Sequence, residues 1–204
     1  LSVTATDAAA AGFVSVGPCD RPLGTTSNVN VGAGATAPNL VITRPDADGH
    51  VCVVSNVDTH LLVDLSGSFT SSADMDVIDA TRVLDTRSPG NERLTGGSTV
   101  AVRVAGTAGV PADASGVVLN LTSADPGGTG FLTVFPCGTA RPTVSNLNVR
   151  PGVNRANLVI VAPGDAGTVC VFSSAPTDVV VDVFGWMRGA FDGLTPTRLF
   201  DTRS

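Results

Sequence analysis

Short apolar segments rich in Val, Thr, Leu and Phe alternate along the chain with clusters of Gly, Pro, Asn, Asp and Ser. The clusters recur at intervals of about ten residues, which is typical of a β-sandwich or a β-barrel. Val100, Val102 and Val104 alternate with Ala101 and Arg103, as in a strand with one apolar face. No window of about a dozen residues has a helical period. The pattern therefore predicts an all-β protein.

The strands predicted in the second half of the chain are apolar segments bounded by turn residues. They are 116–122, 130–136, 145–149, 156–161, 167–172, 178–186 and 197–202. One further strand is predicted at 98–105, and the first half has strands at positions that match those of the second.

The second half of the chain repeats the first at a distance of 118 residues. The matching pairs include Phe13 and Phe131, Cys19 and Cys137, Asn39 and Asn157, and Asp64 and Asp182. The segment 82–87 recurs as 198–203, at a distance of 116 residues. A repeat of this length is a whole small domain and not one turn of a solenoid. We therefore expect two tandem homologous β-sandwich domains, jelly-roll-like or immunoglobulin-like.

Two divisions of the chain into domains fit the repeat. In the first, which we adopt, residues 1–88 and 119–204 are equivalent sandwiches, and 89–118 connects them and contains one strand. In the second, each unit begins at an Asp-Thr-Arg segment, so that 82–187 is complete and the units on either side of it are incomplete. The segment 197–204 would then complete the first domain as an added strand, within one molecule or between neighbours. Pairing between molecules would build a filament.

Four cysteines form two pairs with the same spacing of 33 residues, Cys19 with Cys52 and Cys137 with Cys170. Four cysteines allow three connectivities, and only pairing within each repeat keeps the two copies equivalent. Closing a loop of this length stabilises a domain by about 3 to 4 kcal/mol. Buried free thiols are the alternative, and the spacing argues against a zinc site. Disulfides would indicate a secreted or cell-surface protein.

The composition is that of a folded acidic protein, with 43% hydrophobic residues and a net charge of −6. The twelve basic residues are scattered arginines, whereas nucleic acids and acidic lipids bind clusters of basic residues. No apolar segment approaches the roughly 18 residues of a membrane span, and no signal segment opens the chain. Because the first residue is Leu1, we expect a processed chain or a fragment. We predict no nucleic-acid partner, no membrane insertion, no metal and no cofactor.

Asp64 and Asp182 interrupt apolar strands at equivalent positions. A carboxylate in apolar surroundings is suited to acid–base catalysis, and two of them about 5 to 10 Å apart would fit a glycosidase. The simpler interpretation is structural, because a carboxylate in a protein core is usually paired with a cation. Residues suited to such pairs lie in and beside the two Asp-Thr-Arg segments: Arg82, Asp85, Arg87, Arg198, Asp201 and Arg203. We interpret these charges as ion pairs that lock the domains, and predict no catalytic residues.

Asparagine, which is depleted in strands, also recurs at fixed positions. The pairs are Asn28 and Asn146, Asn30 and Asn148, and Asn39 and Asn157. We interpret these amides as partners for backbone groups in turns or at breaks in strand pairing, with sugar binding as the alternative.

The predicted strand 178–186 differs between the copies in a way that suggests an interface. Its outward phase carries Val180, Asp182, Phe184 and Trp186, whereas the first copy ends in serines at the matching positions. Aromatic residues make up only 4% of the chain, so Phe184 and Trp186, with Val180, are the candidates for an interface or ligand contact. A second buried face of the sheet is the alternative.

The segments 130–137, 145–148, 156–159, 178–182 and 198–203 read GFLTVFPC, SNLN, ANLV, DVVVD and RLFDTR. This set resembles tandem repeats in secreted and surface proteins of GC-rich Gram-positive bacteria, which often flank hydrolase or peptidase domains. The first copy departs from the set, with Gly17 where the second has Phe135 and His60 where it has Asp178. The resemblance implies an extracellular accessory, adhesive or structural module and supplies no catalytic residues.

These observations favour a non-catalytic structural or adhesive module outside the cell, in the form of a self-assembling fibre or a surface-layer building block. Its partners would be further copies of itself or another domain of the same parent protein. The alternative is a glycan-binding accessory module of a secreted hydrolase, with cell-wall polysaccharide as its ligand. The single tryptophan and the absence of tyrosine weaken that alternative, because sugars usually stack on exposed aromatic rings.

Overall fold

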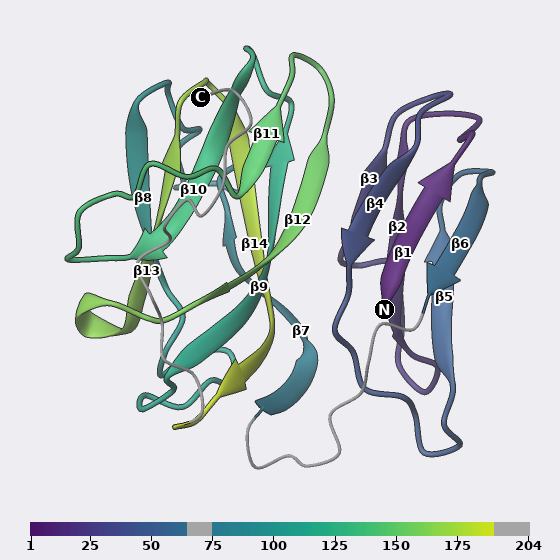
Figure 1. The fold of residues 1–204 in the computed structure, drawn as a ribbon, viewed down its shortest axis with the longest axis horizontal. Coiled ribbons are helices and arrows are strands. Elements are labelled where there is room, and N and C mark those ends of the chain that lie inside the picture. Colours follow the sequence, from purple (N-terminus) through teal and green to yellow (C-terminus); the bar gives the residue numbers. More distant parts are fainter. Residues whose placement is uncertain (65–74, 190–204) are drawn as a thin grey trace, which may run out of the picture.

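The computed structural model describes residues 1–64 and 75–189, and apart from one short 3-10 helix, Asp165–Gly167, the regular structure in these ranges is β-strand. The strands form four sheets, and the sheets form two pairs. Figure 1 shows the two pairs as two groups of strands lying side by side. The predicted all-β fold of two β-sandwiches is confirmed.

The first sandwich is built from two three-stranded antiparallel sheets with the orders β4-β1-β6 and β3-β2-β5. Its strands are β1 (Ser2–Thr6), β2 (Gly12–Pro18), β3 (Val29–Val31), β4 (Ala37–Leu40), β5 (Val51–Ser55) and β6 (His60–Asp64). The core is small, and its buried hydrophobic residues are mainly valines of β1, β2 and β3.

The second sandwich is built from two four-stranded antiparallel sheets with the orders β11-β10-β13-β8 and β12-β9-β14-β7. Its strands are β7 (Met75–Asp85), β8 (Ser98–Arg103), β9 (Gly116–Ala124), β10 (Gly130–Pro136), β11 (Leu147–Val149), β12 (Arg155–Val161), β13 (Thr168–Ser173) and β14 (Asp178–Met187). In β13 buried and partly buried residues alternate, as expected for a strand with one face on the core.

Two neighbouring strands of the second sandwich are buried on both faces. Every residue of β9 is buried, and so is β14 except at its two ends. One face packs on the core of the second sandwich, and part of the other forms a separate apolar cluster that includes Ile42 of the first sandwich. Burial on both faces explains why these two segments read as nearly continuous apolar runs.

The sheets divide the chain differently from the boundaries expected at residues 88 and 118. β7 pairs with β14 and β8 pairs with β13, so both strands belong to the second sandwich. Ile78, Val83 and Leu84 of β7 also pack against its core. The second sandwich therefore begins at β7 and matches the alternative division 82–187 more closely, while the strand predicted at 197–202 lies outside the described residues.

One disulfide closes each sandwich, Cys19–Cys52 in the first and Cys137–Cys170 in the second, as predicted. In both copies the bond joins the end of one strand to a neighbouring strand of the same sheet, β2 to β5 and β10 to β13.

Among the described residues there is no helix with the length and hydropathy needed to cross a membrane.

Candidate functional site at the junction of the two sandwiches

Asp182 lies in the middle of β14 with its side chain 1% exposed, and Arg82 of β7 binds it. Nε of Arg82 donates to Oδ1 at 2.9 Å, and the terminal nitrogen NH2 donates to Oδ2 at 3.4 Å. Burial raises the pKa of Asp182 above the usual range for a carboxyl, and the hydrogen bonds from Arg82 oppose that rise. The guanidinium thus compensates a charge that the apolar strand would otherwise leave without a partner.

The Asp-Thr-Arg segment 85–87 ends β7 with a compact set of hydrogen bonds. Asp85 accepts two hydrogen bonds of 2.8 Å from the guanidinium of Arg87 and one of 3.3 Å from Arg82. The hydrogen bond from Arg87 is the main reason that the pKa of Asp85 lies below its usual range. Thr86 is buried; its hydroxyl donates to Asp178 at 2.8 Å and accepts from the backbone N–H of Val179 at 2.9 Å.

The recurring asparagines make the same hydrogen bonds in both sandwiches. Oδ1 of Asn28 accepts from the backbone N–H of Val16, and Oδ1 of Asn146 accepts from that of Val134, both at 2.7 Å. Asn39 donates to the backbone oxygen of Asn28 at 2.6 Å, just as Asn157 donates to that of Asn146 at 2.7 Å. These amides therefore hold the segments between neighbouring strands in place inside each sandwich.

Asn39 also joins the two sandwiches, which its counterpart does not do among the described contacts. Its Oδ1 accepts from the backbone N–H of Leu158 at 3.0 Å, on the edge strand β12 of the second sandwich. Its Nδ2 donates to Oδ1 of Asn120 at 3.1 Å, and Nδ2 of Asn120 donates to the backbone oxygen of Ser27 at 2.6 Å. Asn39 and Asn120 are both buried, so this bridge, which we call the asparagine bridge, excludes water from the contact.

Phe184 and Trp186 lie on opposite faces of β14, so the expectation that they share an outward face is wrong. The pairing of β14 with β9 shifts between Val183 and Gly185, where one extra residue of β14 forms a β-bulge. Phe184 packs with Val118 and, across the junction, with Ile42. Trp186 turns into the core of the second sandwich and is only 9% exposed. Val180 keeps the same face as Asp182 and is buried.

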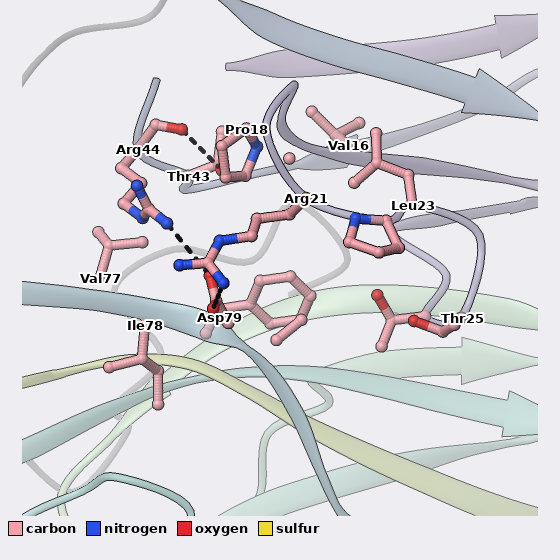
Figure 2. A pocket seen from close by; sticks show the side chains of 15 residues that line it. Val16, Pro18, Arg21, Leu23, Thr25, Thr43, Arg44, Val77, Ile78 and Asp79 are labelled. Carbon is pink, nitrogen blue, oxygen red and sulfur yellow. Dashed lines mark hydrogen bonds and ion pairs between the residues drawn. The ribbon is translucent and has the colours of Figure 1, made fainter. Parts of the chain in front are cut away.

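The first cleft at the junction has a volume of about 310 Å³ and lies between the β2–β3 region of the first sandwich and β7. Figure 2 shows Arg21 and Arg44 pointing toward Asp79 across it. Arg44 donates to Oδ1 of Asp79 at 3.3 Å, and Arg21 lies 3.6 Å from Oδ2. All three side chains are well exposed, so each ion pair adds at most about 1 kcal/mol to the free energy of unfolding.

The second cleft at the junction is more polar and has a volume of about 280 Å³. Arg82, Arg87 and Asp182 of the second sandwich line one side, and Ser27 and Asn30 of the first sandwich line the other. Oγ of Ser27 and Nδ2 of Asn30 are inaccessible to solvent and have no hydrogen-bond partner within the protein. The two guanidinium groups that line the cleft suit a small polar or anionic group.

The carboxylates at the junction are arranged for ion pairing, and this limits the hydrolase hypothesis. The carboxylate of Asp182 is held by Arg82, and Asp85 is held by Arg82 and Arg87. Asp64 ends β6 in the first sandwich, where its backbone pairs with Ser2. Within residues 1–64 and 75–189, no group of three or more His, Cys, Asp or Glu side chains is placed to hold a metal ion.

The roles of two residues at the junction were not predicted from the sequence. Asn120 has Ser2 as its counterpart and Ile42 has Ile160, so neither position repeats an asparagine. Asn120 begins the sequence Asn-Leu-Thr, which fits an N-glycosylation site, but it is buried in the middle of β9. The signal that was available for Asn120 is a polar residue inside the apolar run 117–121. Arg198, Asp201 and Arg203 lie outside the described residues.

Comparison of the chain with protein-family models, with curated proteins and with solved structures gave no match. The resemblance to tandem repeats of bacterial surface proteins therefore stays a prediction.

Proposed function

We propose that the chain is a non-catalytic extracellular structural or adhesive module whose two sandwiches act as one stiff unit. The observation that carries this proposal is the asparagine bridge. A mobile linker between binding domains needs no buried hydrogen bonds across the junction, whereas Asn39 and Asn120 make three. Buried, fully paired amides set one arrangement of two surfaces, because any other arrangement leaves them without partners.

One further feature supports a place outside the cell, and another supports a non-catalytic role. Each sandwich carries a disulfide, and disulfides persist in oxidising compartments. The charged side chains inside the fold are paired with one another, as Asp182 is with Arg82, which suits a role in stability better than one in chemistry.

A fibre or a surface layer is the form of this function that the first sandwich supports. On β5 the edge opposite β2 has no paired strand within the described ranges, although its counterpart β13 is covered by β8. Val54 on this strand is 42% exposed. An open edge with exposed apolar side chains accepts an added strand from a neighbouring molecule.

Negative-stain microscopy and sedimentation velocity over a concentration series test this form. Ordered filaments or arrays of the oxidised chain are expected, and Val54→Lys should reduce them because a charge on an edge strand opposes strand addition. Ile160→Lys, on the edge strand β12 of the second sandwich, is the matched control, because it adds the same charge at an exposed apolar position and leaves the edge of β5 unchanged. A monodisperse monomer at every concentration would contradict the fibre, leaving the stiff two-domain module to be tested by small-angle scattering.

A glycan-binding accessory module is the second candidate, and the second cleft favours it. The amide, hydroxyl and guanidinium side chains that line this cleft are of the kinds that bind the hydroxyls and carboxylates of sugars. The burial of Trp186 removes the stacking platform that such modules usually present. Co-sedimentation with purified peptidoglycan, compared between the unmodified chain and Arg87→Ala, tests this second candidate. Binding of the unmodified chain that is lost in the variant would support a glycan-binding module.

A further inference from the structure

In the part of the chain that the structure describes, no strand covers the outer edge of β6, whereas the outer edge of its counterpart β14 is covered. β14 lies between β9 and β7, whereas β6 pairs with β1 alone among residues 1–64 and 75–189. Figure 1 shows β7 beside β14 and β6 at an outer edge of the first sandwich. The first sandwich therefore lacks, in its described part, the strand that β7 supplies to the second.

The open edge exposes apolar side chains that are buried in the second sandwich. Leu61, Leu62 and Val63 of β6 are 39%, 52% and 45% exposed. Their counterparts Val179, Val180 and Val181 are 0%, 3% and 1% exposed. Three neighbouring exposed apolar residues on a strand edge are typical of a surface that binds a further strand.

The sequence contains a second copy of the segment that covers β14. Residues 82–87 read RVLDTR and residues 198–203 read RLFDTR. In the first of these, Arg82 binds the carboxylate of Asp182 and Thr86 exchanges hydrogen bonds with the backbone of Val179. The same arginine and threonine recur in the second segment, and β6 carries Asp64 and Leu61 at the positions of Asp182 and Val179.

We propose that the segment 198–203 pairs as an antiparallel strand with the outer edge of β6 in the same molecule. The register follows from β7, in which Asp85, Leu84 and Arg82 lie opposite Val180, Val181 and Asp182. Asp201, Phe200 and Arg198 then lie opposite Leu62, Val63 and Asp64. Leu199 and Phe200 replace Val83 and Leu84, which pack against the core of the second sandwich, so they would cover the core of the first.

The length of the chain allows the segment to reach β6 within one molecule. Asp64 and Met75 are eleven positions apart, and so are Met187 and Arg198. Met187 lies opposite Met75 in the sheet, so the first connection ends where the second begins, and the two need to span nearly the same distance. In the proposed register the segment enters at the Asp64 end of β6, where the first connection begins. A tether of this length holds the segment at an effective concentration that a second copy in dilute solution cannot match.

A cysteine pair tests both the register and the source of the strand. Residues directly opposite one another in an antiparallel sheet have Cα atoms about 4.5 to 5.5 Å apart, within the range of a disulfide. Leu62→Cys with Asp201→Cys should therefore form a third disulfide under mild oxidation. Leu62→Cys with Leu199→Cys is the matched control, because a shift of two residues moves the second cysteine about 7 Å along the strand. Peptide mapping by mass spectrometry and non-reducing electrophoresis identify the bond and the chains that it joins.

A disulfide within one chain in the first variant, and none in the control, is the expected result. A disulfide between two chains would overturn the inference by making a second copy the donor. Equal bonding in the two variants would overturn the register.

Hydrogen exchange gives a readout that needs no cysteine. Removal of residues 196–204 should speed exchange at the amide of Leu61 at least about tenfold, while Val179, already covered by Thr86, should not change. Equal exchange at Leu61 with and without the segment would show that β6 is not covered. The inference does not rest on the proposed function, since closure within one molecule leaves the β5 edge free.

Discussion

The two sandwiches have equivalent disulfides, the same internal asparagine contacts and the same order of their shared strands, yet in their described parts they are not equally complete. The second has four-stranded sheets, because β7 and β8 add to the outer edges of β14 and β13, and the first has three-stranded sheets in its described part. Counting only residues 1–64 and 75–189, the buried apolar cluster of the second contains 21 residues and that of the first contains eight. Repetition in sequence thus preserves the contacts inside a unit, while the completeness of each unit depends on which neighbouring segments reach it.

The largest effect is expected from removing the disulfides one at a time. Each bond closes a loop of 33 residues and stabilises its sandwich by about 3 to 4 kcal/mol. Cys19→Ala with Cys52→Ala should unfold the first sandwich, because its small core cannot offset that loss. Cys137→Ala with Cys170→Ala should leave the second folded but less stable. Denaturant titration followed by circular dichroism checks this, and equal loss in both variants would contradict the difference between the cores.

The second-largest effect is expected from removing the guanidinium that faces Asp182. Arg82→Ala leaves a buried carboxylate without a partner and should lower the free energy of unfolding by about 2 to 4 kcal/mol at neutral pH. Burial raises the pKa of Asp182, and the loss of Arg82 would raise it further. A group whose pKa is raised by folding favours the folded state as pH falls, so the cost of Arg82→Ala should shrink in acid.

The control for this variant is Arg82→Ala combined with Asp182→Asn, which removes the buried charge. Denaturant titrations at pH 7 and pH 5 should show the double variant to be more stable than the single one at pH 7 and less different from it at pH 5. The same low stability in both variants would mean that Arg82 acts through packing alone.

The asparagine bridge distinguishes two residues that are equivalent in sequence. Asn39→Ala removes hydrogen bonds to Asn28, Asn120 and Leu158, and should cost about 2 to 3 kcal/mol. Asn157→Ala removes the bond to Asn146 and should cost about 1 kcal/mol. Small-angle scattering should show a larger radius of gyration for Asn39→Ala only, and an unchanged radius would indicate that other contacts hold the sandwiches together.

The smallest effect concerns Asp85, whose pKa is lowered by folding. Such a carboxylate stabilises the folded state above its ordinary pKa of about 3.9, and this contribution is lost as pH falls through the lower folded value. Asp85→Asn should therefore cost about 1 kcal/mol at pH 7 and much less near pH 2. Urea titrations at the two pH values check this, and a cost that does not depend on pH would assign the effect to lost hydrogen bonds.

Much of the fold could be predicted because it is recorded in local patterns. The apolar run and turn residues around 130–136 define β10, and the equal spacing of the cysteines defines the two disulfides. The place of β7 was harder to predict, because its pairing with β14 depends on partners such as Arg82 and Asp182 that are a hundred positions apart. A local pattern shows that a strand exists but not which sandwich receives it.

The site was predicted less completely, and the orientation of Trp186 shows why. Strict alternation along β14 would place it beside Phe184, but the β-bulge before Gly185 reverses the faces. A glycine inside a strand is the available signal, since an added Cβ there would lie 2.7 Å from the backbone oxygen of Asp76. Asn120 was missed because its role depends on the other sandwich, which local sequence does not describe.

The two disulfides also limit how far the chain can lengthen when its ends are pulled apart. An extended chain spans at most about 3.3 to 3.6 Å per residue, so each loop of 33 residues withholds roughly 110 Å from the stretched molecule. A tether made of such units would yield only through the residues outside the loops, and reduction of both bonds would add roughly 220 Å of extension. Each bond therefore acts as a mechanical stop as well as a source of stability.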